Sequence, residues 1–126
     1  MTGSPLERLA SEDFCYLTTT GRRTGKPHEI EIWFAASGRT AYILMGAGER
    51  ADTVRNLRAD RRVRFRIGTR SWSANARVVT AAREVALARR LVPAKYAAHE
   101  DGLEEWAAGA LPVAIDLPDH DRRQEP

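Results

Sequence analysis

Apolar and polar side chains alternate along several short segments of the chain, a pattern typical of half-buried β-strands. In residues 62–67 apolar residues alternate with arginines, and residues 71–79 follow after a turn at Gly68, which predicts a hairpin. Residues 40–45 are apolar on both faces, so we expect a central strand there. The strands predicted in this way cover residues 14–20, 29–34, 40–45, 62–67, 71–79 and 111–117.

Helical spacing marks the segments between these strands. Val54 and Leu57 recur at helical intervals from Asp52 onward, which predicts a short helix that ends near Asp60. The other predicted helices cover residues 6–13, residues 81–91 up to the break at Pro93, and the region of Leu103, Trp106 and Ala107.

Most of the predicted strands are neighbours in the sequence. Such connections favour an antiparallel sheet closed into a small barrel, with helices packed outside, over a doubly wound parallel sheet. The fold class expected is therefore α+β and mainly β. The length of 126 residues suits one domain, which we place at residues 1–117, followed by a charged tail at 118–126.

The cysteine content and the apolar runs bear on location. Cys15 is the single cysteine and forms no intrachain disulfide, which is consistent with a reducing compartment. The first residues lack the apolar stretch of a secretory signal, and the longest near-apolar run, residues 41–48, is too short to cross a bilayer. We expect a soluble, cytoplasmic protein without a membrane span.

The charge balance is mildly basic, with 20 Lys and Arg against 17 Asp and Glu, a net charge of +3. Many arginines fall between residues 50 and 70, so a nucleic-acid surface is conceivable. It ranks last, because Arg62, Arg64 and Arg66 alternate with apolar residues as solvated arginines on a strand do, and the net charge is low. We expect no nucleic-acid partner, and no metal, because no Cys, His and carboxylate set has ligand spacing.

The connection at residues 21–27, Gly-Arg-Arg-Thr-Gly-Lys-Pro, is the segment most suggestive of ligand binding. Its glycines allow a sharp turn that exposes backbone N–H groups, and Arg22, Arg23 and Lys26 add positive charge. An anion fits such a turn. Local sequence alone favours the alternative of a solvated basic turn, because the segment is neither a P-loop nor a dinucleotide fingerprint.

Several motifs together resemble a known family. They are Thr-Thr-Thr-Gly-Arg-Arg-Thr-Gly-Lys-Pro at residues 18–27, Asn56-Leu57 on a helix, the Val63-x-Phe65-x-Ile67-Gly68 strand and the Leu111-Pro112-Val113 strand. In this order they resemble the deazaflavin-dependent nitroreductase family. The resemblance implies a split β-barrel like that of pyridoxamine-phosphate oxidases, binding of the deazaflavin coenzyme F-420, and hydride transfer from its reduced form to a small acceptor such as a quinone, a nitroaromatic or an enone.

The resemblance also assigns site residues. Arg22, Arg23 and Thr24 fall on the family's basic turn, which meets the anionic tail of the coenzyme, and Met45 and Ala47 fall where the deazaflavin ring is approached. The cofactor-binding residues expected are Thr20, Arg22, Arg23, Thr24, Lys26, His28, Met45, Gly46, Ala47, Arg55 and Asn56. The candidate proton donors are Tyr16, His28 and Tyr96, with water as the alternative.

Some positions depart from the family pattern and leave the acceptor open. His28, Glu31, Trp33 and Thr53 differ from the residues common there. The alternatives are an FMN-dependent oxidoreductase on the same barrel and a non-enzymatic protein that carries the coenzyme or a fatty acid. By analogy with related barrels we expect a homodimer.

Overall fold

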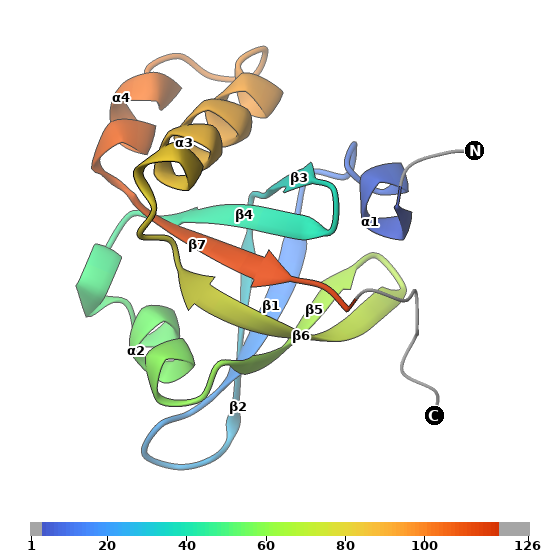
Figure 1. The fold of residues 1–126 in the computed structure, drawn as a ribbon, viewed down its shortest axis with the longest axis vertical. Helices are drawn as coiled ribbons and strands as arrows, with labels where there is room; N and C mark the ends of the chain where they lie inside the picture. The colour runs from blue at the N-terminus through green and yellow to red at the C-terminus, as the bar shows by residue number, and fades with distance from the viewer. Residues whose placement is uncertain (1–3, 119–126) are drawn as a thin grey trace.

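The strands form one antiparallel sheet in the order β2-β1-β5-β6-β7-β4-β3. The computed structural model describes residues 4–118. The strands are β1 (Cys15–Thr20), β2 (Pro27–Ile32), β3 (Ala35–Ser37), β4 (Thr40–Met45), β5 (Arg62–Ile67), β6 (Arg70–Val78) and β7 (Leu111–Asp116). The helices are α1 (Pro5–Arg8), α2 (Asp52–Ala59), α3 (Ala82–Tyr96) and α4 (Leu103–Gly109), with a 3₁₀ turn η1 (Gly48–Arg50). The sheet curls into the half-barrel seen in Figure 1, which confirms the predicted antiparallel barrel class.

The concave side of the sheet encloses the main hydrophobic core. Leu17, Phe65, Trp72 and Ile115 contribute to it from β1, β5, β6 and β7, and each is at most 1% exposed. The alternation of apolar residues and arginines in β5 predicts this burial, because the apolar side chains face the core whereas Arg62 and the neighbouring arginines point outward. The hairpin predicted around Gly68 is confirmed by the pairing of β5 with β6.

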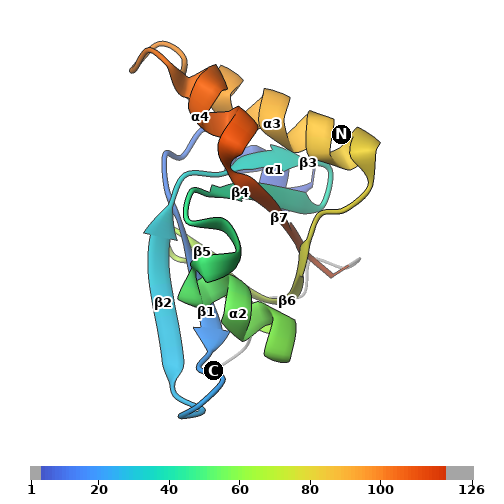
Figure 2. The same ribbon diagram turned by 90° about the vertical axis from the view of Figure 1, so that its left-hand side faces the viewer.

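Strand β4 is buried on both faces, as its composition predicts. Ile43 packs in the barrel core, whereas Tyr42 and Leu44 pack in a second cluster with Val92 and Tyr96 of α3. In Figures 1 and 2 helices α3 and α4 lie together over this side of the sheet. The second core explains why the helices after β6 carry apolar faces.

The predicted strand at residues 29–34 is interrupted. The chain leaves β2 after Ile32 and resumes at Ala35 in β3, with a bend between them. Contacts from α3 hold the bend: the Phe34 N–H donates to the Tyr96 hydroxyl at 3.1 Å, and the Lys95 amine donates to the Phe34 carbonyl at 2.9 Å. The Tyr96 hydroxyl also donates to the Asp13 carbonyl at 2.6 Å. The alternation of apolar and polar residues at 29–34 does not indicate these distant hydrogen-bond partners, so the interruption could not be predicted from it.

Two helix boundaries also differ from prediction. Helix α1 spans only Pro5–Arg8, and Leu6 is its one buried residue, so packing supports a single turn. Helix α3 continues through Pro93 to Tyr96, because the burial of both residues outweighs the hydrogen bond that proline cannot donate. Within residues 4–118 no helix is long and apolar enough to cross a membrane. The predicted boundary between domain and tail stays a prediction, since residues 119–126 lie outside the described residues.

The bend at Phe34 gives a testable expectation for stability. Tyr96→Phe keeps the buried ring but removes the hydroxyl that bonds to Phe34 and Asp13, so we expect the free energy of unfolding to fall by about 1–3 kcal/mol in urea denaturation. The control is Tyr16→Phe, which removes an exposed hydroxyl bonded to Glu31 and is expected to change stability by about 0.5 kcal/mol or less. Equal losses in the two variants would contradict a role for Tyr96 in holding the bend.

Candidate functional site

The turn between β1 and β2 is closed by its own backbone. The Gly21 N–H donates to the Lys26 carbonyl at 2.7 Å, and the Gly25 N–H donates to the Gly21 carbonyl at 2.8 Å. Gly25 has φ of 73°, a conformation that favours glycine. A Cβ on Gly21 would lie 2.9 Å from the Thr24 hydroxyl oxygen, so the turn is too tight there for a side chain. The sequence pattern of two glycines in this connection is therefore explained by geometry.

Asn56 of α2 fixes Arg22 within this turn. Its side chain is buried, and its Oδ1 accepts hydrogen bonds from the Arg22 peptide N–H at 3.1 Å and from Arg22 Nη1 at 2.9 Å. Its Nδ2 donates to the Thr19 hydroxyl at 3.1 Å. Figure 2 shows α2 beside the end of the β1–β2 hairpin. Asn56, which lies thirty-four residues further along the chain, thus holds Arg22 in a fixed position.

A cleft of about 300 Å³ lies between the turn and α2. It is lined by Gly21, Arg22, Arg23, Thr24, Lys26, Pro27, His28, Asp52 and Asn56. Among the described residues, nothing accepts a hydrogen bond from the peptide N–H groups of Arg23 and Thr24. The cationic side chains that line this cleft, with Arg22 held in place by Asn56, suit an anion such as a phosphate ester.

The structure therefore brings together six of the residues named from sequence: Arg22, Arg23, Thr24, Lys26, His28 and Asn56. Arg55 lies on α2 but its guanidinium donates to the Glu49 carbonyl at 3.2 Å, outside the lining of this cleft. Asp52 lines the cleft and was not among the residues named. Its position four residues before Asn56, one helical turn away on the same face, is the signal that could have found it.

The end of β4 lies next to an aromatic cluster. A Cβ on Gly46 would lie 3.6 Å from Trp106 Nε1, so Gly46 is close to the α4 side chain. Trp106 meets Trp33 edge-on at 6.1 Å, and Trp33 stacks on Tyr96 at 4.1 Å between ring centroids. Met45 is buried beside this position, whereas Gly46 and Ala47 are exposed. Flat apolar side chains of this kind suit a planar ring.

The three candidate proton donors fall in different places. His28 lines the cleft. The Tyr16 hydroxyl donates to Glu31 on the outer face of the sheet, a hydrogen bond that raises the pKa of Tyr16. Tyr96 is 2% exposed, and burial raises its pKa to about 12. A phenol with a raised pKa gives up its proton less readily, which argues against both tyrosines as proton donors.

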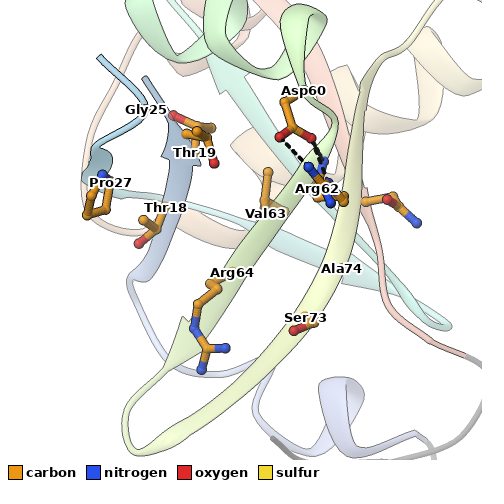
Figure 3. A pocket seen from close by; sticks show the side chains of 12 residues that line it. Thr18, Thr19, Gly25, Pro27, Asp60, Arg62, Val63, Arg64, Ser73 and Ala74 are labelled. Atoms are coloured by element: carbon orange, nitrogen blue, oxygen red, sulfur yellow. Dashed lines mark hydrogen bonds and ion pairs between the residues drawn. The ribbon is translucent and has the colours of Figure 1, made fainter. Parts of the chain in front are cut away.

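A second groove, of about 680 Å³, opens between β1 and β5, and residues of β6 also line it (Figure 3). It forms because β1 pairs with β5 only over Tyr16–Thr18, so the two strands separate beyond Thr18. Thr20 lines this groove rather than the cleft at α2. Arg62 is bonded to Asp60 at its edge, at 2.9–3.1 Å. Within the described part of the chain, no group of three or more metal-ligating side chains occurs.

The curled antiparallel sheet, with a basic hairpin turn braced by α2, defines a split-barrel protein. A sequence model of the family described as F-420H(2)-dependent quinone reductase matches residues 2–118, and the chain belongs to this family. It is an enzyme of a family that uses reduced coenzyme F-420. The resemblance seen in the sequence is thereby confirmed.

Solved structures agree on the fold. A putative pyridoxamine 5'-phosphate oxidase from Listeria innocua is 17% identical, covers 94% of this chain and 93% of its own, and superposes with a TM-score of 0.69. An F-420-H2 dependent reductase is 14% identical, with 82% and 94% covered and a TM-score of 0.67. A chain described as a domain-swapped dimer is 15% identical, with 82% and 80% covered and a TM-score of 0.68. No curated protein matches the chain.

The hydrogen bonds of Asn56 are expected to stabilise the folded protein. Asn56→Ala leaves the Thr19 hydroxyl and the Arg22 peptide N–H without their buried partner, so the free energy of unfolding should fall by about 2 kcal/mol in urea denaturation. Asn75→Ala is the control, because Asn75 is exposed on β6 and should cost about 0.5 kcal/mol or less. An Asn56→Ala variant as stable as the control would show that the brace contributes little to the fold.

Proposed function

We propose that the cleft between the β1–β2 turn and α2 holds the anionic tail of reduced coenzyme F-420, and that the enzyme reduces a quinone-like acceptor. The observation that carries this proposal is the fixed Arg22 side chain, held by the buried Asn56 in a cleft that Arg23 and Lys26 also line. The phosphodiester and carboxylates of the coenzyme tail are anions that arginine binds well. When bound, the reduced coenzyme supplies the hydride.

The chain's own residues bind and orient the coenzyme. Arg22 enters the interaction already positioned, which lowers the entropy lost on binding. Arg23 and Lys26 are exposed and add charge at the mouth of the cleft. His28 lines the same cleft, so its imidazole lies at the tail of the coenzyme, and water is the proton source we propose at the ring.

A quinone is the acceptor favoured here, because the family is described by that activity and because Trp33 and Trp106 offer flat apolar surface near Gly46. Met45 and Ala47 flank Gly46 at the end of β4, and we place the ring contacts of the coenzyme there. Nitroaromatic and enone acceptors share the planar, electron-poor character of a quinone and belong in the same assay.

Three further features are part of the proposal. A homodimer is supported by the structural neighbour described as a domain-swapped dimer, whose fold this chain shares. A reducing, cytoplasmic location is supported by Cys15, which is free and buried. We also propose one domain at residues 1–117, supported by the single sheet that runs from β1 to β7.

Titration with cofactors tests the proposal. Coenzyme F-420 is expected to bind saturably and to quench Trp33 and Trp106, which are partly buried near β4, more than the buried Trp72. Arg22→Ala should raise the Kd about tenfold or more by removing a charge-assisted contact. The matched control is Arg62→Ala, which removes an arginine bonded to Asp60 at the other groove and should leave the Kd unchanged.

Turnover with a soluble benzoquinone, followed as oxidation of the reduced coenzyme, tests the second half of the proposal. Binding without oxidation in the presence of any acceptor would favour a coenzyme carrier. Saturable binding of FMN instead of F-420 would favour the flavin-dependent alternative, and binding of neither would exclude both cofactor roles.

A further inference from the structure

The indole of Trp106 presents a hydrogen-bond donor beside Gly46. Trp106 Nε1 lies 3.6 Å from the position that a Cβ on Gly46 would occupy, and in Figure 1 the helix that carries Trp106, α4, lies next to the end of β4. Within residues 4–118 the indole N–H donates no hydrogen bond, yet Nε1 is not a buried, unsatisfied atom. The donor is therefore accessible from solvent.

Gly46 leaves the space beside this donor open. The residue is exposed and its φ is not positive, so the backbone conformation does not require glycine there. A Cβ at Gly46 would meet Trp106 Nε1 in ordinary van der Waals contact, so the packing does not require glycine either. What the missing side chain provides is room for another atom to approach the indole nitrogen.

The surroundings of the donor are apolar and flat. Trp106 packs against the second core, and its ring meets the ring of Trp33 edge-on at 6.1 Å between centroids. Small-molecule sites typically combine such apolar surface with a few polar groups that orient the ligand. An indole N–H is a donor only, so the ligand atom that it orients must be an acceptor. A planar ring with an oxygen at its edge, such as a quinone, has the matching chemistry.

The charge that develops on a quinone calls for a donor of this kind. Its reduction takes up a hydride, supplied by the reduced coenzyme, which is thereby oxidised by two electrons, and a proton from water. Between these two additions one oxygen of the acceptor carries the negative charge of a phenolate. A donor already in place stabilises this charged oxygen more than the neutral carbonyl of the quinone, and so lowers the barrier.

We propose that Trp106 is a catalytic residue, whose indole N–H donates a hydrogen bond to the acceptor oxygen on which the negative charge develops. The proposal goes beyond the flat surface of the aromatic cluster, because it assigns a polar role to one atom of it. It rests on the proposed function, since it takes the acceptor to be reduced beside Gly46.

Binding of p-nitrophenol tests the donor without the coenzyme, because its phenolate resembles the anionic form of the acceptor. At a pH where the free dye is half ionised, the absorbance of the bound dye gives its ratio of phenolate to phenol. We expect the native chain to raise this ratio about three- to tenfold, because a hydrogen bond to a charged oxygen is the stronger one. Trp106→Phe keeps an aromatic ring without the N–H and should return the ratio close to that of the free dye.

A second variant leaves Trp106 itself unchanged. Gly46→Ala places a methyl group beside Nε1 and should also lower the ratio. Gly109→Ala is its matched control, because Gly109 is exposed and nothing lies within 4 Å of a Cβ there, so the native ratio should be kept. Urea denaturation checks that each variant is folded. In turnover with benzoquinone at saturating coenzyme, Trp106→Phe should lower kcat about tenfold.

Several outcomes would overturn the proposal. A native chain that leaves the ratio of the dye unchanged, or an unchanged ratio in either Trp106→Phe or Gly46→Ala, would show that the indole N–H does not bind the phenolate oxygen. An equal loss in Gly109→Ala would remove the link to this position, and an unchanged kcat in Trp106→Phe would remove the catalytic role. If the native chain fails to bind F-420, the proposed function fails, while the dye still decides whether Trp106 binds a phenolate.

Discussion

Burial of β4 on both faces is the constraint on which the rest of this fold depends. Ile43 packs in the barrel core and Leu44 packs against α3, so a shift of one residue would exchange the side chains of the two cores. The register with β7, in which Ile43 lies opposite Val113, is thereby fixed. The end of β4 then sets where the chain leaves the sheet at Gly46 and where α2 starts. Hydrophobic packing thus determines where Asn56 meets the hairpin turn.

Elements whose burial follows a local pattern could be predicted from the sequence. The β5–β6 hairpin is apparent from alternation on both sides of Gly68, and β4 from an apolar run too short for a helix. The break at Phe34 could not be predicted, because its hydrogen-bond partner Tyr96 lies 62 residues further on. The continuation of α3 through Pro93 likewise depends on tertiary burial, which overrides local preference.

The site was predictable in part for similar reasons. The basic turn is visible from its glycines and arginines, and the motif resemblance connected it with Asn56. The sequence did not show what Asn56 does there. The Asn56 side-chain amide forms hydrogen bonds with Arg22 and Thr19 and so holds the turn, in addition to lining the cleft. Nor did it show the opening between β1 and β5, because the separation of two strands beyond Thr18 depends on the curl of the whole sheet.

The Tyr96 side chain has two structural roles. Its hydroxyl holds the backbone at Phe34, and its ring carries the stacked Trp33 that forms part of the aromatic cluster near Gly46. At the proposed acceptor site, changes that reshape the cluster therefore act on the same residue that secures the bend. A substitution at Trp33 would thus disturb the ring stacked on Tyr96, whereas a substitution at Trp106 would leave that stacked pair intact.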